Sequence, residues 1–301
     1  MKKILITGSS GFLGSKIYNY FRNHKYKTLR LDRSSEVDFC CDLSTEIPNL
    51  DKDFDLVIHC AGKAHITPKT VDEKQEFYNV NFEGTKNLLK GFRINGTPKY
   101  FIFISSVSVY GLSKGDFISE TYPLLANDSY GKSKIKAEEV IKDWSKKNKV
   151  KYTILRLPLL VGKNPPGNLA SMIKALNKGY YFNIGGGKAR RSMIVVNDVI
   201  KFILLIYNKG GTYNLTDGVH PSYYELSFVF NKFNNKNPPL NMPLIIAKMV
   251  AKIGDLIQII PINTLKLGKL TSTLTFDDSK SRKVVNFKAQ SVLDFLKKNK
   301  I

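Results

Sequence analysis

The sequence lacks the residues that hold together proteins without a large hydrophobic core. Its cysteines, Cys40, Cys41 and Cys60, form no metal-ligand spacing and are too few for a disulfide framework, so a disulfide-rich secreted scaffold is excluded. The four histidines are scattered, and His59, at the end of an apolar segment, is interpreted as a packed core residue. We therefore expect no metal site. No uncharged apolar run approaches the roughly 20 residues that a membrane-spanning helix needs.

Hydrophobic residues make up 43% of the 301 positions, which is enough to bury a substantial core and excludes a disordered or fibrous chain. A strand-like segment already begins at Lys2, so we expect no signal peptide before it. Together with the cysteine usage, this predicts a soluble protein of the reducing cytoplasm.

Acidic residues are scarce in the second half of the chain. Residues 151–301 carry +16 of the formal net charge of +22. Such a half could attract nucleic acid, an anionic membrane surface or a small polyanionic substrate. A lysine-rich composition spread over solvated faces also accounts for the total. The lysines are dispersed and no recognition motif accompanies them, so a nucleic-acid-binding protein is the weaker hypothesis and no specific nucleic acid is expected.

Short apolar segments alternate with amphipathic ones over the first half of the chain. Such alternation predicts right-handed crossovers and a Rossmann-type, doubly wound parallel sheet of the α/β class. The predicted strands cover 3–7, 27–31, 54–60, 99–104 and 152–157, and the later helices cover 80–92 and 133–147.

Beyond residue 157 the pattern loosens into short helices separated by proline and glycine turns. We expect a dinucleotide-binding domain over 1–157 and a smaller, mostly helical substrate-binding region over 158–301, interleaved with the first. The apolar stretch 244–262 contains Lys248, Lys252 and Asp255. We interpret it as a core-facing helix over the substrate pocket; an amphipathic helix making peripheral contact with an anionic membrane is the alternative.

A glycine-rich loop between the first strand and its helix predicts a phosphate site. Gly8, Gly11 and Gly14 are spaced as GxxGxxG. Glycines there allow a tight turn, let the backbone approach a pyrophosphate and open a helix whose N–H groups bind the anion.

Asp32 ends the second predicted strand, 18 residues after Gly14. A carboxylate here can accept hydrogen bonds from the ribose hydroxyls of adenosine, which favours NAD. Arg30 and Arg33 lie beside it and could meet a 2′-phosphate, so NADP stays open.

Tyr130 and Lys134 form a YxxxK pair at the start of a helix. Residues four apart share a helical face, so the ammonium is expected near the phenol, where it lowers the pKa of Tyr130 toward a useful range for acid–base catalysis. The pair follows a strand that ends in Ser105 and Ser106, at the edge where parallel sheets bind ligands.

These motifs occur in an order that resembles the extended short-chain dehydrogenase/reductases acting on nucleotide sugars, the NAD-dependent epimerase/dehydratase family. The resemblance covers nearly the whole chain. It is carried by Gly8–Gly14, Cys60–Gly62, Asn81–Thr85, Ser105–Gly111, Tyr130–Lys134, Gly167–Leu169, Arg191–Asp198 and Asp278–Ser281.

The resemblance implies a catalytic trio of Ser106, Tyr130 and Lys134. Tyr130 would exchange the proton on the sugar O4, Ser106 would hydrogen-bond the reacting oxygen, and Lys134 would bind the nicotinamide ribose. Ser105 is the fallback for Ser106. The implied cofactor contacts, besides Tyr130 and Lys134, are Gly8, Ser10, Gly11, Phe12, Leu13, Asp32, Arg33, Asp42, Leu43, Ala61, Gly62 and Asn81.

On the substrate side the resemblance implies that Asn168 lies in a nucleotide-binding loop and that Arg191 contacts the diphosphate. It also suggests a homodimer formed through a helix pair of the cofactor domain.

Departures from the family pattern narrow the reaction. The acidic pair of the 4,6-dehydratases is replaced by Val107 and Ser108, and Leu267–Leu270 stands where UDP-hexose 4-epimerases have Arg-x-Gly-Asp. The chain therefore looks closest to bacterial O-antigen and capsule enzymes that reduce a UDP-4-keto-6-deoxy-N-acetylhexosamine. A UDP-sugar 4-epimerase, acting on UDP-glucose or UDP-N-acetylglucosamine, is the alternative, because both reactions share one half-step. A cofactor-binding module without catalysis is disfavoured by the intact trio.

Overall fold

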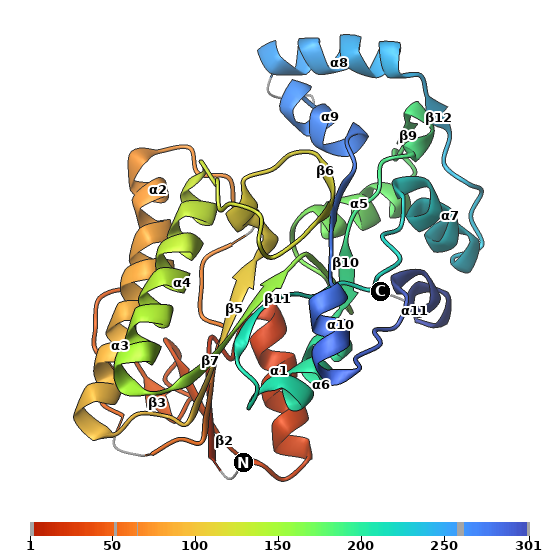
Figure 1. Cartoon of the computed structure of the whole chain (residues 1–301). Coiled ribbons are helices and arrows are strands. Elements are labelled where there is room, and N and C mark those ends of the chain that lie inside the picture. Colours follow the sequence, from red (N-terminus) through yellow and green to blue (C-terminus); the bar gives the residue numbers. More distant parts are fainter. Residues whose placement is uncertain (1–2, 51–52, 65, 258–261, 300–301) are drawn as a thin grey trace.

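The computed structural model describes residues 3–50, 53–64, 66–257 and 262–299. A central parallel sheet runs through it in the order β11-β7-β5-β4-β1-β2-β3 (Figure 1). Its strands are β1 (Lys3–Thr7), β2 (Lys27–Asp32), β3 (Phe39–Cys40), β4 (Leu56–His59), β5 (Tyr100–Ser106), β7 (Lys151–Leu157) and β11 (Gly211–Asn214). The strand order reverses between β1 and β4, which makes the sheet doubly wound and confirms the predicted Rossmann-type fold.

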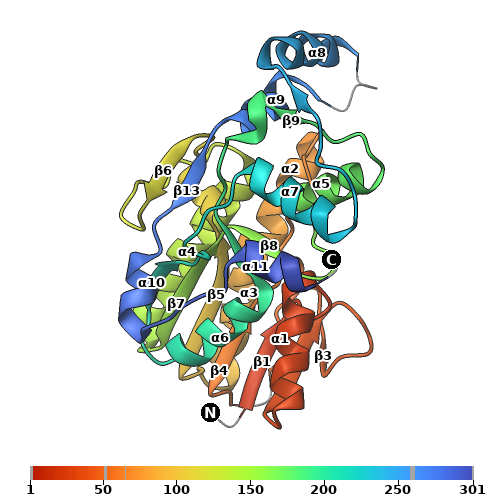
Figure 2. The same cartoon turned by 90° about the vertical axis from the view of Figure 1, so that its right-hand side faces the viewer.

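Helices cover both faces of this sheet (Figures 1 and 2). One face packs on α1 (Phe12–Asn23) and α6 (Val196–Ile206), and the other on α3 (Gly84–Asn95) and α4 (Ser129–Asn148). Both faces are therefore buried at the centre of the sheet, which explains why the inner strands β1 and β4 are apolar at successive positions.

The region beyond residue 157 both completes the sheet and builds over its carboxyl end. β11 pairs with β7, and α6 lies in the same core cluster as Ile4 and Ile17. β11 and α6 therefore belong to the same sheet and core as the first half of the chain. The region between 158 and 301 contributes to the fold of the predicted cofactor domain as well as to the predicted substrate side.

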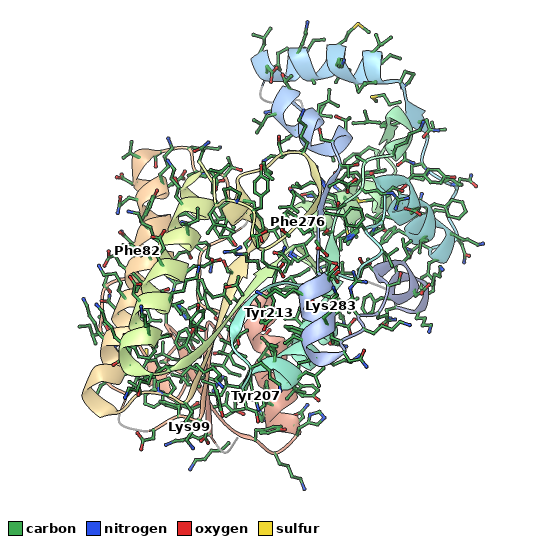
Figure 3. All side chains as sticks on the ribbon, viewed as in Figure 1. Phe82, Lys99, Tyr207, Tyr213, Phe276 and Lys283 are labelled. Atoms are coloured by element: carbon green, nitrogen blue, oxygen red, sulfur yellow. The ribbon has the colours of Figure 1, made fainter. Side chains whose placement is uncertain are left out.

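In the described residues, three short two-stranded parallel sheets lie outside the central sheet, and each contains at least one strand of the second half. They are β8 (Leu159–Val161) with β10 (Met193–Val195), β9 (Asn183–Ile184) with β12 (Asn241–Met242), and β6 (Gly115–Ile118) with β13 (Leu274–Phe276). Phe276 of β13 stacks on Tyr110 with ring centroids 5.5 Å apart. Figure 3 places Phe276 near the middle of the molecule and Lys99, which precedes β5, near its lower end.

The remaining helices are short. They are α2 (Val71–Tyr78), a π-helical segment (Asn79–Glu83), a 3-10 turn (Val107–Tyr110), α5 (Gly167–Asn177), a second 3-10 turn (Gly185–Gly187), α7 (Tyr223–Phe233), α8 (Leu244–Leu256), α9 (Thr264–Thr271), α10 (Ser279–Val285) and α11 (Val292–Lys298). Within the described ranges, none of the helices has the length and apolar character needed to cross a membrane.

The core-facing interpretation of 244–262 is wrong for the part that the structure describes; residues 258–261 lie outside it. α8 presents Ala247, Ala251 and Gly254 to the protein and leaves its larger apolar side chains exposed. The small residues allow α8 to approach Leu267 of α9 closely.

Candidate functional site

The loop between β1 and α1 is built so tightly that side chains cannot replace Gly8 and Gly14. Gly8 has a φ of +65°, and a Cβ there would lie 2.6 Å from the backbone of Ala61. A Cβ on Gly14 would lie 2.1 Å from the Gly8 carbonyl oxygen. Gly11 occupies the N-cap of α1 and offers no side-chain cap, so the first-turn N–H groups are available to an anion. The loop fits a pyrophosphate group.

The two residues that follow Gly11 anchor the helix. Leu13 is buried in the core, and the half-buried Phe12 ring lies 3.4 Å from the position of a Cβ on Gly162. The loop after β8 thus lies beside the phosphate loop.

Asp32 lies at the end of β2, facing the glycine loop. One carboxylate oxygen accepts hydrogen bonds from the Ser10 N–H (2.9 Å) and the Ser10 hydroxyl (2.7 Å), and the other from the Arg33 N–H (2.9 Å). Burial raises the pKa of Asp32, but these hydrogen bonds outweigh it and hold the pKa below its usual value. The carboxylate is therefore ionised and within reach of a ligand on the loop.

Of the two arginines beside Asp32, Arg30 is directed elsewhere. It lies 3.9 Å from the Asp38 carboxylate and over the Tyr18 ring, at 4.9 Å from the centroid. Arg33 is exposed. The hydrogen bonds from Ser44 lower the pKa of Asp42, and the charge of Arg33 adds a smaller effect in the same direction. Arg33 is thus the basic side chain better placed to meet a 2′-phosphate.

The loops after β3 and β4 approach the same region. Asp42 accepts hydrogen bonds from the N–H (2.9 Å) and hydroxyl (2.6 Å) of Ser44, and the buried Leu43 accepts at its carbonyl from Asn87 of α3. The Ala61 N–H donates to the Thr7 hydroxyl at 3.2 Å. The Asp42 carboxylate thus stabilises a local turn through Ser44. Ala61 connects the end of β4 to β1 at the point where the strand order reverses.

Ser106 and Tyr130 meet at the carboxyl end of β5. Burial raises the pKa of Tyr130, and a hydrogen bond with the Ser106 side chain lowers it in part. The net pKa lies above the ordinary value, opposite to the direction expected from the YxxxK spacing. The reason is that the Tyr130 phenol is desolvated, while the Lys134 ammonium donates to the Ile104 carbonyl at 3.0 Å.

Ser105, the residue before Ser106, faces the protein interior and not the site. Ser105 is buried and donates to the Glu138 carboxylate at 2.6 Å, because successive residues of a strand point to opposite faces. Ser106, with Tyr130 beside it, is therefore the better placed of the two to meet a substrate.

Lys134 lies one turn after Tyr130 on α4 and is only 4% exposed. Burial lowers its pKa to about 8, against the charges of Cys60 and Glu138, which raise it. The ammonium lies 4.5 Å from the centroid of Phe103 and would be 3.1 Å from a Cβ on Gly62. Only glycine at position 62 leaves the ammonium this room.

Asn81 lies in the π-helical segment between α2 and α3. Its side-chain amide donates to the Ser133 hydroxyl (2.9 Å) and the Lys63 carbonyl (3.1 Å), and its oxygen accepts from the Lys63 N–H (2.8 Å). π-helical segments are rare and often occur at functional sites. Asn81 here joins the loop after β4 to α4 at Ser133, the residue immediately before Lys134.

A buried ion pair below the trio was missed by the sequence reasoning. Arg156 of β7 holds Glu138 through two hydrogen bonds, and its other terminal nitrogen donates to the Tyr110 hydroxyl at 3.1 Å. Glu138 lies one turn beyond Lys134 on α4, so the network fixes the helix that carries the trio. An acidic residue at i+4 from Lys134 was the available signal.

Arg191 lies just before β10 and is 8% exposed. Its guanidinium donates to the Tyr223 hydroxyl at 3.3 Å and to the Lys269 carbonyl of α9. Arg191 forms an isolated bridge with Leu274 of β13, which pairs with β6. β6 follows the turn that begins after Ser106. The bridge therefore connects the segment that carries Arg191 to the segment that follows Ser106. Asn168 is exposed on the first turn of α5.

His59 is confirmed as a packed histidine. Its ring nitrogens contact the hydroxyls of Thr7 (2.6 Å) and Thr85 (3.0 Å). Burial, and then the Lys134 charge, lower the pKa of His59 to about 3, so the ring is neutral at physiological pH.

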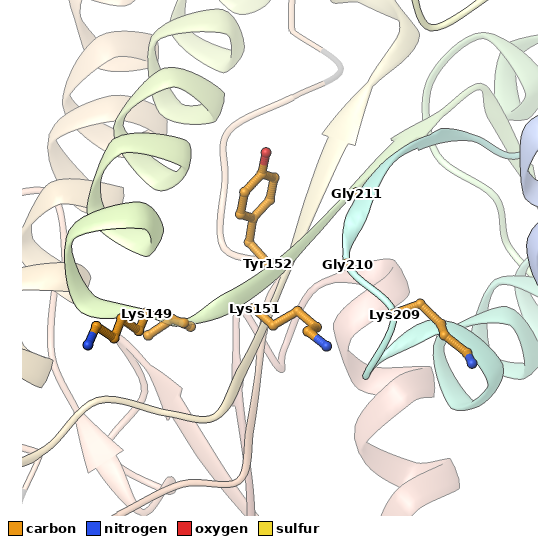
Figure 4. Close-up of a pocket in the computed structure, with 7 residues that line it drawn as sticks. Lys149, Lys151, Tyr152, Lys209, Gly210 and Gly211 are labelled. Atoms are coloured by element: carbon orange, nitrogen blue, oxygen red, sulfur yellow. The ribbon is translucent and has the colours of Figure 1, made fainter.

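A separate pocket of about 390 Å³ lies at the other edge of the sheet (Figure 4). It is lined by the segments that lead into β7 and β11, among them Lys151, Tyr152 and Lys209. In parallel sheets ligands bind at the carboxyl ends of the strands, so we do not place the site there. Within the described residues, no group of three or more His, Cys, Asp or Glu side chains could hold a metal ion.

A model of the NAD dependent epimerase/dehydratase family matches residues 4–216. Among curated proteins, the chain is 28% identical to the N-acetyl-alpha-D-glucosaminyl-diphospho-ditrans,octacis-undecaprenol 4-epimerase of Escherichia coli O157:H7, over 92% of this chain and 88% of that protein. It is 27% identical to the UDP-glucose 4-epimerase of Vibrio cholerae, over 97% and 92% of the two chains.

Among solved structures, the UDP-glucose 4-epimerase of Thermotoga maritima with UDP-glucose is similar, with a TM-score of 0.76, 20% identity and coverage of 98% and 96%. The UDP-glucuronic acid 4-epimerase of Bacillus cereus in complex with NAD has a TM-score of 0.75, 21% identity and the same coverage. At these identities the likeness concerns the fold.

Proposed function

Since the chain belongs to the NAD dependent epimerase/dehydratase family, we propose that it is an NAD-dependent enzyme acting at C4 of a diphosphate-linked sugar, in the first place a UDP-sugar 4-epimerase. The observation that carries the proposal is the meeting of Ser106 and Tyr130 above the buried Lys134 ammonium. The 4-epimerase relatives, aligned over nearly the whole chain, support that reaction over others of the family.

The residues present fit a nicotinamide dinucleotide. The Gly8–Gly14 turn leaves space where any Cβ would collide, α1 offers its uncapped first turn, and Asp32 is ionised beside the loop. We expect the pyrophosphate at Gly11, Phe12 and Leu13, the adenosine ribose at Asp32, and the nicotinamide ribose at Lys134. Asp32 favours NAD, while Arg33 leaves NADP acceptable. The chemistry that the cofactor supplies when bound is hydride exchange with C4 of the sugar.

The chain's own residues handle the proton. Tyr130 would take the proton from the sugar O4 when C4 is oxidised and return it when C4 is reduced, while Ser106 holds the same oxygen by a hydrogen bond. Below pH 8 the Lys134 ammonium is charged. A positive charge one helix turn from Tyr130 would favour the phenolate that forms there during the reaction. Lys134 is buried, whereas Tyr130 is half-buried and so can be reached by a substrate.

Arg191 would hold the diphosphate of the substrate, with Asn168 at the nucleotide end. A guanidinium can donate two parallel hydrogen bonds to phosphate oxygens, and Arg191 is already oriented by Tyr223. The positive second half of the chain would favour the approach of such a dianion.

Reduction of a UDP-4-keto-6-deoxy-N-acetylhexosamine is the second candidate. Leu267–Leu270 replaces the Arg-x-Gly-Asp expected of UDP-hexose 4-epimerases, and in the structure it belongs to α9, whose Lys269 contacts Arg191 only through its carbonyl. This departure favours the reductase. For either reaction we propose that the enzyme is cytoplasmic and forms a homodimer. We further propose that it acts in O-antigen or capsule synthesis.

The test separates the two reactions. The purified chain is incubated with NAD and UDP-glucose or UDP-N-acetylglucosamine, and separately with NADH or NADPH and the 4-keto sugar nucleotide. Appearance of the C4 epimer without net cofactor turnover supports the epimerase. Stoichiometric loss of reduced cofactor supports the reductase. Neither product, with a folded protein that binds NAD, would reject both. Tyr130→Phe should abolish whichever product forms, lowering turnover roughly 10²–10⁴-fold, whereas Tyr180→Phe, at an exposed position, should not.

A further inference from the structure

α8 carries its large apolar side chains away from the protein. Each residue of a helix turns by about 100°, which puts Ala247, Ala251 and Gly254 on one stripe, and these three are buried. The opposite stripe contains Ile245, Met249, Ile253 and Leu256, whose exposed fractions are 74%, 54%, 48% and 86%. We call these four side chains the outer stripe. A helix that uses only small residues for packing and exposes four large apolar ones is inverted relative to an ordinary surface helix.

The outer stripe is part of a larger apolar area. Ile246 and Ile257 of the same segment and Leu265 of α9 are exposed as well. Contiguous apolar surface of this kind marks an interaction site in a soluble domain.

Lysines flank the outer stripe. Lys248 and Lys252 are exposed on one side of α8, and α9 adds Lys266 and Lys269. Asp255, the acidic residue of this segment, accepts hydrogen bonds from Thr264. The outer stripe is therefore bordered by positive charge along one side of α8, and the neighbouring α9 is also positive.

The position of α8 matches this composition. In both views it forms the outermost tip of the molecule, with its axis along the surface (Figures 1 and 2). The strands of the central sheet point their carboxyl ends toward the same end of the molecule (Figure 1). α8 contacts α9, and α9 contacts Arg191 through the Lys269 carbonyl, so the tip is linked to the proposed diphosphate site.

We propose that the outer stripe of α8 docks on the surface of an anionic phospholipid bilayer. An apolar helix face flanked by lysines is the composition of helices that lie in the bilayer interface, where the lysine stems reach along the apolar region and the ammonium groups meet lipid phosphates. A bilayer accommodates a convex stripe without a complementary groove. A second copy of this chain would bring the same lysine border against itself, which is unfavourable. The proposal is independent of the reaction at the site.

The test is flotation of the full chain with vesicles of phosphatidylcholine alone or with an equal amount of phosphatidylglycerol. We expect binding to the mixed vesicles that weakens with added salt. The Ile245→Ser/Leu256→Ser double variant should lower the partition coefficient at least about tenfold, because two apolar side chains no longer enter the interface. Lys248→Glu/Lys252→Glu should lose the preference for phosphatidylglycerol, again by about tenfold or more.

Matched controls lie far from α8. Leu205→Ser, at an exposed apolar position of α6, and Lys209→Glu, at the opposite edge of the sheet, should float as the unchanged protein does. Circular dichroism checks that each variant is folded. No flotation with phosphatidylglycerol vesicles, or equal flotation of all variants, would overturn the proposal. So would a dimer in sedimentation equilibrium that Ile245→Ser/Leu256→Ser dissociates, since a second copy would then cover the stripe.

Discussion

Arg156 and Glu138 form a buried, two-pronged ion pair, with hydrogen bonds of 3.1 and 2.7 Å, directly beneath the helix turn that carries Lys134. Both side chains are almost completely enclosed. The pair joins β7 to α4, and Ser105 adds a third hydrogen bond to the same carboxylate. The geometry of the candidate site therefore depends on a charge pair that would not touch the substrate.

Removing one partner of this pair should be costly. Glu138→Gln leaves the Arg156 guanidinium buried without a counter-charge, and we expect the free energy of unfolding to fall by about 3–5 kcal/mol. Urea unfolding measures this. Asp294→Asn, which breaks the exposed pair with Lys297 on α11, should change it little. Equal effects of the two substitutions would mean that the buried pair is not the stabilising element.

Lys134 should make stability depend on alkaline pH. Its pKa is about 8 in the fold against 10.5 unperturbed, so between these values the unfolded chain binds more protons and the folded state gains stability as pH rises. Below pH 8 the cost of the buried charge is fully present. Lys134→Met removes it. The stability advantage of the variant should therefore shrink by about 3 kcal/mol between pH 8 and 10.5. Urea unfolding across this range tests it; a constant difference contradicts it.

The glycine loop should tolerate no added methyl group. Gly14→Ala places a Cβ 2.1 Å from the Gly8 carbonyl oxygen, so the loop must move and we expect NAD affinity to fall at least about tenfold. Titration calorimetry with NAD measures the change. Gly268→Ala is the matched control, since its Cβ would meet nothing within 4 Å. Unchanged NAD binding by the Gly14 variant would move the dinucleotide away from this loop.

Arg191 should control the affinity for the substrate diphosphate. Arg191→Ala removes a two-donor partner of the phosphates, and we expect UDP to bind about 10–100-fold more weakly. Arg190→Ala alters the neighbouring arginine, which is exposed and pairs with Glu225, and should leave UDP binding nearly unchanged. If the Arg190 variant loses more affinity than the Arg191 variant, the two roles are exchanged.

The sheet was predictable because its strands are buried on both faces. Apolar segments flanked by glycine or polar residues placed β1, β4, β5 and β7 within two residues of their observed bounds, and the alternating segment 27–31 did the same for β2. The two-residue strand β3 and the pair β6–β13 escaped, because such short strands carry no period of their own and form only where another segment pairs with them.

The residues of the candidate site were predictable where the local backbone or the helix spacing requires one particular residue type. Gly8 and Gly14 are required by the turn itself, and Tyr130 and Lys134 by their shared helix face. The direction in which the pKa of Tyr130 is shifted was not predictable from the sequence. The shift depends on how far the phenol is buried, and residue spacing does not encode burial. α8 was misjudged for a related reason: a helix made of Ile, Leu, Ala and Lys has two apolar stripes, and periodicity does not say which one faces the protein.

The pairing of β11 with β7 has a consequence for synthesis. A ribosome releases the chain from its N-terminus, and Gly211 follows Leu157 by more than fifty residues. At about 5–20 residues per second, β7 emerges roughly 3–10 s before its outer neighbour exists. During that interval the nascent chain displays an unpaired, apolar strand edge of the kind that captures other polypeptides. A fragment ending at residue 157 would keep that edge permanently, so we expect it to aggregate where the full chain folds.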